Sequence, residues 1–440
     1  MFANRSLAFV SRACVFLFAL LVLGNNLAAD KSSVGSLTIR NDRKECTVQP
    51  GGSNATDDAV AIRAAFDECG HGGKVVFLNE TYYVNSVLNT SGLEDVDIEL
   101  HGTLLWSTDV DYWLNNSLPM GYQNHTTAWI FGGRGVRFQG FGYGTFDGNG
   151  QVWYDFAGSV SNYPHRPHQL TIWETYDSVF EGLRFVQSQM WTMTVKNSEN
   201  VLLQDIYVNN TSENDSSARN TDGADTIYAK NITFNRWHIV NGDDGIAIKA
   251  NSSEIYIYDT IFEDGQSLAI GSIGQFLNWY EFIENVYARN ITLINTRWAI
   301  YLKTWTGVQK GYPPNGGGGG LGYMRNITME SVTHVRTRGL FQITQCTSYN
   351  DESGDCDTSR FHIGPGITFR NHTGTTTATE AADLQCSADA DGCDGVEISG
   401  IDVTIVGSNG TVVDGYECSN VVEPTVGFVC DDEGEDDGDQ

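Results

Sequence analysis

The stretches Ser178-Val179-Phe180-Glu181-Gly182-Leu183 and Asn200-Val201-Leu202-Leu203-Gln204-Asp205 share a short pattern, in which a turn-forming residue precedes a β-type run. Related runs follow at Asn231–Phe234, Ser253–Ile257, Asn285–Ala288 and Asn326–Met329. Successive copies lie roughly 22 to 41 residues apart, and self-similarity of this size is typical of a solenoid. We therefore predict an all-β fold, a right-handed parallel β-helix whose coils stack about 4.8 Å apart. A propeller, the alternative, would have more even repeats of about 40 to 45 residues.

One helix is predicted near the start of the solenoid. Residues 57–66 begin with two aspartates and then carry apolar residues at helical spacing. Gly70 to Gly73 end this helix, and Lys74-Val75-Val76-Phe77-Leu78 is predicted to be a strand. A short helix here would cover the N-terminal end of the β-helix, where the core would otherwise be open.

The N-terminus has the features of a secretory signal peptide. Arg5 and Arg12 precede an apolar run from Ala13 to Leu23, and Leu27-Ala28-Ala29 offers a cleavage site. The run is too short to span a bilayer comfortably, and no other segment is apolar enough to do so. We predict a signal peptide at 1–29, a single β-helix domain at 30–425 and an acidic, disordered tail at 426–440. The mature protein is expected to be secreted, extracellular and monomeric, without membrane attachment.

Cysteines and glycosylation sequons fit an extracellular protein. Beyond the signal peptide the chain has Cys46, Cys69, Cys346, Cys356, Cys386, Cys393, Cys418 and Cys430. An even number in a secreted chain indicates disulfides, and local pairs such as Cys346–Cys356 and Cys386–Cys393 are suggested. Sequons run from Asn54-Ala-Thr to Asn409-Gly-Thr.

The formal net charge of −29 excludes nucleic acid as a partner, because phosphate contacts need a basic face. A polyanionic polysaccharide would also be repelled at long range. A site for an acidic sugar must therefore provide its own nearby cations.

Two aspartate motifs are candidates for chemistry. Asn220-Thr221-Asp222-Gly223 and Gly242-Asp243-Asp244-Gly245 place Asp222 and Asp243 21 residues apart, about one coil. Stacking would bring the carboxylates together, and their mutual repulsion should raise the pKa of at least one. Glycoside hydrolysis needs such a pair, one acid and one base. Aspartate and glycine also form turns, and physical reasoning alone leaves the two interpretations balanced.

The doubled aspartate requires an irregular backbone. Neighbouring side chains of an ideal strand point to opposite faces, so Asp243 and Asp244 can share a cleft only if the chain bends between them. The flanking Gly242 and Gly245 would permit such a bend.

These motifs resemble those of glycoside hydrolase family 28, the polygalacturonases and related pectin hydrolases. The family shows Asn-Thr-Asp, Gly-Asp-Asp, Gly-His-Gly and Arg-Ile-Lys, and the first two are matched fully at the expected separation. Supporting matches are Asp58–Ile62 with Gly72–Phe77, Gly144–Trp153, Arg166-Pro167-His168 and Met190-Trp191-Thr192. The resemblance covers about residues 45–345 and favours a fungal type.

The resemblance implies roles for individual residues. Asp243 would be the general acid, and Asp222 and Asp244 would together hold the attacking water as general base. The reaction would invert the anomeric centre and would need no metal or cofactor. Asn220, within the first motif, would contact substrate.

The sequence departs from the family at three places. Gly265-Gln266-Ser267 stands for Gly-His-Gly, and Tyr301-Leu302-Lys303 stands for Arg-Ile-Lys. Gln266 can bind substrate by hydrogen bonds but carries no charge. Tyr301 replaces a guanidinium that would grip a carboxylate, Lys303 keeps one cation, and Tyr301 and Trp305 offer rings on which a sugar could stack. Gly245 stands where the family commonly has a cysteine.

These departures favour an exo-acting or rhamnogalacturonan-directed enzyme over a plain endo-polygalacturonase. The leading expectation is an exo-polygalacturonase, a galacturan 1,4-α-galacturonidase. The close alternative is an α-L-rhamnosidase or exo-rhamnogalacturonase, and the distant ones are an inactive carbohydrate-binding wall protein and a calcium-dependent pectate lyase. Loops around Ser107 to Thr127 and Gly316 to Gly320 are expected to close one end of the cleft. The expected partner is a pectic polysaccharide or oligosaccharide.

Overall fold

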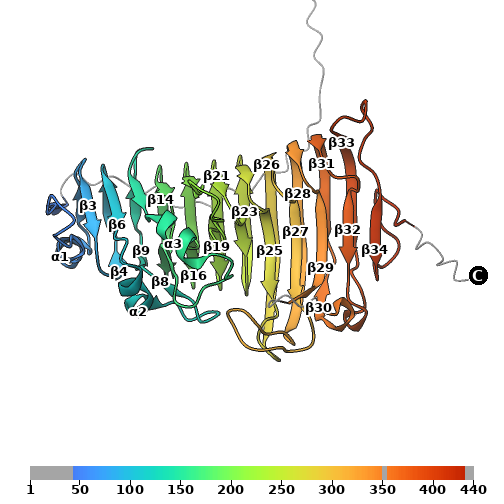
Figure 1. Cartoon of the computed structure of the whole chain (residues 1–440), viewed down its shortest axis with the longest axis horizontal. Helices are drawn as coiled ribbons and strands as arrows, with labels where there is room; N and C mark the ends of the chain where they lie inside the picture. Colours follow the sequence, from blue (N-terminus) through green and yellow to red (C-terminus); the bar gives the residue numbers. More distant parts are fainter. Residues whose placement is uncertain (1–42, 349–353, 432–440) are drawn as a thin grey trace, which may run out of the picture. The chain divides into compact units, whose positions relative to one another are not determined.

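The computed structural model describes residues 43–348 and 354–431. The predicted signal peptide and residues 432–440 of the predicted tail lie outside this part of the chain. The described residues form mostly short strands, and nearly every strand pairs in parallel with strands from the coils before and after it (Figure 1). The all-β, right-handed parallel β-helix predicted from the repeats is therefore confirmed. Within the described ranges, we find no helix long and apolar enough to cross a membrane.

The wall of the β-helix consists of three rows of stacked strands. The first row is β4 (Leu88–Glu94), β9 (Trp129–Arg134), β13 (Leu170–Trp173), β16 (Met193–Lys196), β19 (Ala224–Ile227), β22 (Asp244–Ile248), β25 (Ser267–Ile273), β27 (Ile300–Trp305), β29 (Phe341–Thr347), β32 (Ala382–Gln385) and β34 (Tyr416–Ser419).

The second row is β1 (Glu45–Val48), β2 (Lys74–Phe77), β5 (Asp97–Leu100), β10 (Arg137–Gln139), β14 (Tyr176–Glu181), β17 (Glu199–Gln204), β20 (Lys230–Asn235) and β23 (Ser252–Tyr258). The third is β3 (Thr81–Val84), β6 (Thr103–Trp106), β11 (Thr145–Asp147), β15 (Arg184–Val186), β18 (Tyr207–Asn209), β21 (His238–Asn241) and β24 (Ile261–Asp264). The long strands β26 (Tyr280–Ile294), β28 (Leu321–Thr337), β31 (Ile367–Thr376) and β33 (Val396–Ile405) continue both rows, and β30 (Arg360–Ile363) pairs with β28.

The repeated sequence pattern corresponds to the second row. Phe180 stacks on Leu203, and Leu203 stacks on Phe234, so that the same apolar position recurs coil after coil. The recurrent asparagine has a local cause, since Asn200 and Asn231 have φ values of 59° and 52°. Asparagine tolerates this left-handed conformation, and Asn231 Nδ2 also donates to Asn200 Oδ1 at 2.7 Å.

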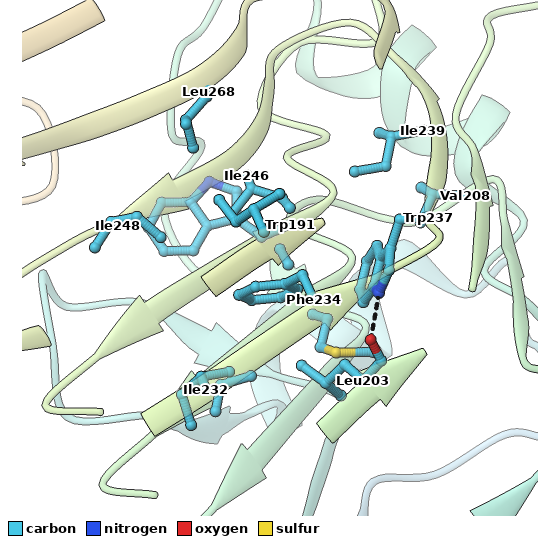
Figure 2. Close-up of a cluster of buried hydrophobic side chains, with 14 of the residues drawn as sticks. Trp191, Leu203, Val208, Ile232, Phe234, Trp237, Ile239, Ile246, Ile248 and Leu268 are labelled. Carbon is cyan, nitrogen blue, oxygen red and sulfur yellow. Dashed lines mark hydrogen bonds between the residues drawn. The ribbon is translucent and has the colours of Figure 1, made fainter. Parts of the chain in front are cut away.

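The core lies between the three rows. Ile232, Phe234, Ile246, Ile248 and Leu268 pack side by side in it and are fully buried (Figure 2). Each such side chain contributes about 1.5–3 kcal/mol to folding relative to an exposed position. The polar edge of the buried Trp237 is satisfied, because its Nε1 donates to the Leu203 carbonyl at 2.9 Å.

Helix α1 (Ala59–Cys69) confirms the predicted capping helix. Its buried face includes Phe66, whose ring contacts Phe77 and Trp129 at centroid distances of 6.4 and 6.2 Å. The Cys46–Cys69 disulfide ties this helix to β1.

Both suggested local disulfides, Cys346–Cys356 and Cys386–Cys393, are present, and Cys418–Cys430 forms a further one. The described start of the predicted tail belongs to the fold. Val426 bridges to Glu397, and Phe428 packs against the Tyr416 ring at 5.1 Å.

The remaining elements lie in the connections between the strands of the three rows. They are α2 (Val110–Asn116), α3 (Gly150–Ala157), the 3-10 turns η1 (Cys356–Thr358) and η2 (Ala388–Ala390), and a small sheet of β7 (Leu118–Pro119), β8 (Thr126–Thr127) and β12 (Pro167–His168). Both α2 and α3 lie in insertions between strands, and the small sheet joins two of these insertions.

Candidate active site

Three carboxylates meet at the outer face of the first row. Asp244 is the first residue of β22, Asp243 precedes it, and Asp222 lies two residues before β19. One oxygen from each carboxylate lies within 4.8 Å of the others. Asp222 and Asp244 are buried, and Asp243 is half-buried. The clustering expected from the one-coil spacing is therefore present.

A β-bulge lets consecutive aspartates share this face. The register between β22 and β25 shifts between Asp244 and Ile246, which leaves Gly245 as the extra residue. A Cβ at Gly245 would lie 2.3 Å from the Phe262 ring, and one at Gly242 would lie 2.4 Å from the Ala218 carbonyl oxygen. Both glycines are thus required sterically, and Phe262 occupies the space that a cysteine at position 245 would need.

Backbone donors fix the Asp243 carboxylate. The amide of Asn220 donates to Asp243 Oδ2 at 2.9 Å, and the amide of Asp244 donates to Asp243 Oδ1 at 3.0 Å. Burial, followed by the Asp244 charge, raises the pKa of Asp243. A carboxyl group with a raised pKa holds its proton to higher pH.

Asp222 is in a still less favourable setting for charge. Burial is the main cause that raises its pKa well above the ordinary value, and Asp225, Asp243 and Asp244 add to the shift. Among the described residues its Oδ1 has no hydrogen-bond partner. The expectation that at least one carboxylate of the cluster has a raised pKa is confirmed for both Asp222 and Asp243.

Asp244 is held by the two side chains that replace the family's Arg-Ile-Lys motif. The Tyr301 hydroxyl donates to Asp244 Oδ1, and Lys303 Nζ lies 2.9 Å from Asp244 Oδ2. Lys303 Nζ also donates to the Tyr301 hydroxyl oxygen at 2.8 Å. Burial raises the pKa of Tyr301 well above 10, which keeps its hydroxyl protonated as a donor.

The other predicted substrate-binding residues differ in position. Gln266 is half-buried, and its backbone amide donates to the Asp243 carbonyl at 2.8 Å. Asn220 accepts a hydrogen bond from the Asn162 amide at 2.8 Å. Trp305 is 1% exposed, so its ring offers no open surface to a sugar. Tyr301, 7% exposed, contributes its hydroxyl group more than a ring face.

A buried polar cluster lies beside the carboxylates, partly in the same coils and partly in the coils before them. We use this name for Arg166, His168, Gln189, Asp225 and Lys249. Burial lowers the pKa of Arg166 to about 10, whereas Asp243 and Asp222 favour its charged form. Its Nη atoms, both amide atoms of Gln189 and both carboxylate oxygens of Asp225 have no hydrogen-bond partner in the described chain. Buried polar atoms of this kind require a water molecule or a ligand.

The charges of this cluster are not fully compensated. Lys249 Nζ lies 3.5 Å from Asp225 Oδ1, yet burial raises the pKa of Asp225 to about 8. His168 contacts Thr194 Oγ1 and His125 Nδ1 at 2.9 and 3.1 Å. Burial lowers the pKa of His168 well below 6.5, so the ring is neutral.

Most of the buried polar cluster was missed as a site by sequence reasoning, although Arg166 and His168 were matched to the family. A usable signal existed in the strands. Asp225 and Lys249 are charged residues in the otherwise apolar runs Ala224–Ile227 and Ile246–Ala250. Both occupy outward positions of the first row, where Asp225 pairs with Ala247.

Loops from both directions along the β-helix meet over the first row. Gln123 Nε2 donates to Gln275 Oε1 at 2.5 Å, and Gln275 Nε2 donates to the Pro314 carbonyl at 2.9 Å. Asn315 Nδ2 lies 3.5 Å from the Asn162 carbonyl oxygen. The loops around Ser107 to Thr127 and Gly316 to Gly320 are therefore joined across the first row through their neighbouring residues.

Two segments rich in glycine or threonine have fixed places in the fold. The loop Gly316 to Gly320 is a buried backbone segment, with Gly318 N donating to Gln275 O at 2.8 Å. A Cβ at Gly317 would lie 2.3 Å from the same oxygen, so only glycine fits. The run Thr373 to Thr376 belongs to β31, because β-branched threonine suits a paired strand.

The three carboxylates are close enough to hold a cation, although Asp244 already has two hydrogen-bonded partners. Lys303 supplies positive charge at 2.9 Å from Asp244 Oδ2, the position where a metal would otherwise neutralise the cluster. Hard metal ions prefer six or more oxygen ligands, and the cluster offers few uncommitted ones.

A parallel β-helix with this carboxylate cluster defines a polysaccharide-hydrolase type of site. Residues 80–427 match the model of glycosyl hydrolases family 28. The chain therefore belongs to glycoside hydrolase family 28 and is an O-glycosyl hydrolase.

Named relatives and solved structures agree with this assignment. Alpha-L-rhamnosidase rgxB of Aspergillus niger is 49% identical over 420 residues, which cover 94% of this chain and 95% of the relative. The putative galacturan 1,4-alpha-galacturonidase A of Aspergillus niger is 36% identical over 88% of this chain and 92% of its own. The endo-xylogalacturonan hydrolase structure from Aspergillus tubingensis superposes with a TM-score of 0.75 at 29% identity, covering 88% and 98% of the two chains.

Proposed function

We propose that this protein is a secreted, exo-acting α-L-rhamnosidase that removes terminal rhamnose from pectic rhamnogalacturonan. Four disulfides support an extracellular setting. The protein would act as a monomer on a pectic oligosaccharide or polysaccharide. The wider assignment, a pectin-acting hydrolase, follows from the names of the family relatives.

Asp243 is the proposed general acid. Its raised pKa keeps a proton available for the leaving glycosidic oxygen, and the two amide hydrogen bonds fix its direction. Asp222 and Asp244 are the proposed base pair. Asp244, which accepts from Tyr301 and Lys303, takes the proton of the attacking water, and Asp222, whose raised pKa favours its protonated form, positions this water through its uncommitted Oδ1.

The observation that carries the rhamnose assignment is the contact between Lys303, Tyr301 and Asp244. Tyr301 stands where the family has a guanidinium, and Lys303 Nζ is 2.9 Å from a carboxylate of the cluster itself. A uronate whose carboxylate pointed at Tyr301 would have no bidentate partner and would face three carboxylates. Rhamnose has no carboxylate, so it avoids this repulsion. The 49% identity to the Aspergillus niger rhamnosidase supports the same choice.

The second candidate is a galacturan 1,4-α-galacturonidase, the leading expectation from sequence. One observation favours it: Arg166 and Lys249 put two cations in the buried polar cluster, where a terminal uronate could place its carboxylate. The Aspergillus niger relative named as a putative galacturan 1,4-alpha-galacturonidase is 36% identical to this chain.

Product analysis separates the candidates. The secreted protein would be incubated with galacturonate oligomers, with rhamnogalacturonan oligomers ending in rhamnose and with an aryl α-L-rhamnoside. Free rhamnose from the last two alone is the expected result. Free galacturonate from the first alone would replace the proposal with the galacturonidase. No product from any of them by the parent protein, with binding retained, would favour the inactive wall protein.

The stereochemical outcome is a separate test. Oxygens of the three carboxylates lie within 4.8 Å of one another, and a short separation is typical of retaining enzymes, whereas the family resemblance implies inversion. We expect inversion, because two of the carboxylates can hold a water between them. Proton NMR of the first-formed anomer decides, and retention would make one aspartate a nucleophile.

A further inference from the structure

A groove continues the first row on the C-terminal side of the carboxylates. The outward column of this row runs from Ala247 through Ala269 and Tyr301 to Gln342 and Asp383. It leads from the Asp244 contact to a hollow of about 240 Å³. The hollow is lined by residues of four successive coils, among them Trp298, Arg338, Glu380, Asp383 and Glu417.

Trp298 forms the near wall of this groove. It is half-buried and packs against the cluster of Ala247, Ala269 and Tyr301, whose hydroxyl binds Asp244. A Cβ at Gly339 would lie 2.5 Å from the indole ring, so the missing side chain lets the ring lie against the backbone. An indole so placed offers a surface on which a sugar ring can stack.

Arginines accompany the indole. Arg338 is exposed, and its Nη2 reaches the Gly265 carbonyl at 3.3 Å, next to Gln266. The Arg297 guanidinium lies 5.9 Å from the Trp298 ring centre. Among the described residues neither arginine forms an ion pair with a carboxylate. In a chain of net charge −29, two such guanidiniums beside one indole form a local anion-attracting surface.

The far end of the hollow is acidic. Asp383 accepts a hydrogen bond from Gln342 Nε2 at 3.0 Å, and Glu380 and Glu417 line the same end. Carboxylates there would repel a second uronate but can accept hydrogen bonds from sugar hydroxyls. The groove therefore suits an acidic sugar near the site followed by a neutral one, the alternation found in a rhamnogalacturonan backbone.

We infer that this groove binds the galacturonate released on the leaving side of the scissile rhamnosyl bond, with Arg338 on its carboxylate and Trp298 against the chain. The inference rests on the proposed function and adds the residues that bind the leaving group. Position supports it: coils stack about 4.8 Å apart, so Gly265 and Trp298 lie roughly one and two coils beyond Asp243, within reach of the next sugars. The enclosed side of the cleft would hold the terminal rhamnose.

The test compares substrates that differ only on the leaving side. They are an aryl α-L-rhamnoside, an acidic oligomer ending in rhamnose, and the same oligomer with its carboxylates reduced to alcohols. The variants are Arg338→Ala, Arg338→Lys and Trp298→Ala. Arg336→Ala is the matched control, because Arg336 is an exposed arginine close in sequence that does not line the hollow.

For Arg338→Ala we expect kcat/KM on the acidic oligomer to fall about tenfold relative to the aryl rhamnoside, mostly through KM, with Arg338→Lys intermediate. The reduced oligomer has no carboxylate for Arg338 to bind. On this substrate the kcat/KM of Arg338→Ala should therefore be close to that of the parent. Trp298→Ala should weaken the binding of both oligomers to the same extent. Arg336→Ala should match the parent.

Two results would overturn the inference. One is an equal loss for Arg338→Ala on all three substrates, and the other is no loss on the acidic oligomer. Failure of the proposed function is seen separately, since it appears in the parent protein as no release of rhamnose from the aryl rhamnoside or from either oligomer.

Discussion

The two sides of the carboxylate cluster differ, although both are built from the same row of strands. On the N-terminal side Arg166 is 1% exposed, and Asp225 and Lys249, in the coils of the carboxylates themselves, are at most 4% exposed, beneath loops that meet across the row. On the C-terminal side Arg338 is exposed and Trp298 half-buried, beside an open hollow of about 240 Å³. One side can enclose a chain end, and the other can receive the rest of a chain.

The difference comes from the connections rather than from the strands. The segments between β6 and β9 and between β11 and β13 are long insertions that carry α2 and α3. The turns between β26 and β27 and between β28 and β29 span only residues 295–299 and 338–340. Turns this short cannot cover the row, so Arg297 and Arg338 stay exposed.

The largest expected effect lies at the boundary of the two sides. Asp243→Asn removes the proton donor while keeping the shape and hydrogen-bonding capacity of the side chain, so kcat should fall roughly 10²–10⁴-fold. Binding of a rhamnose-ended oligomer, measured by calorimetry, should persist. Retained turnover would remove Asp243 from the acid role, and lost binding with an unchanged circular dichroism spectrum would assign it to recognition.

The enclosed side should respond more strongly than the groove. Arg166→Gln removes a buried donor that faces the site, and loss of a hydrogen bond involving a charged group costs about 1.5–3 kcal/mol, which corresponds to roughly 10–150-fold in kcat/KM. The loss should be the same on acidic and carboxyl-reduced oligomers, in contrast to Arg338→Ala. Thermal unfolding of Arg166→Gln controls for misfolding. A loss confined to substrates with a terminal uronate would support the galacturonidase instead.

Tyr301→Phe tests the link between the carboxylates and the groove. Phenylalanine keeps the packing against Ala247 and Ala269 but removes the hydroxyl that donates to Asp244. We expect kcat to fall about tenfold with little change in KM, the lower end for a charge-assisted hydrogen bond. A rise in KM alone would mean that Tyr301 binds substrate and does not position Asp244.

The fold and the carboxylates could be predicted because both depend on local, repeated signals. The spacing of the Asn200 and Asn231 runs follows the coil length, and the one-coil separation of Asp222 and Asp243 gives their contact directly. Gly242 and Gly245 also indicated the bulge, since a backbone this tightly packed leaves no room for a side chain.

The groove and the enclosed side could not be predicted in the same way. Whether Trp305 or Trp298 offers a surface depends on what covers each ring, and Trp305 is buried while Trp298 is not. The Gln123–Gln275 contact joins residues 152 positions apart, and no repeat spacing encodes such a pair. Burial by insertions is a tertiary property, so residue type alone did not identify Arg166 or Arg338.

The smallest expected effect concerns stability and pH. Burial raises the folded-state pKa of Asp225 to about 8 and that of Glu281 to about 7, above their unfolded values, so their contributions to stability decline as pH rises from about 4 to these values. Burial lowers the pKa of His125 to about 3 and that of His334 to about 4, so their contributions increase with pH up to about 6.5 and then stay constant. From pH 6.5 to 8 the carboxyl groups therefore dominate, and the melting temperature should fall by a few degrees.

Asp225→Asn should flatten this decline, whereas Glu417→Gln, an exposed carboxylate on the groove side, should leave it unchanged. An equal decline in Asp225→Asn and the parent would show that burial does not raise the pKa of Asp225, and the enclosed side would then lose the electrostatic feature that distinguishes it from the groove.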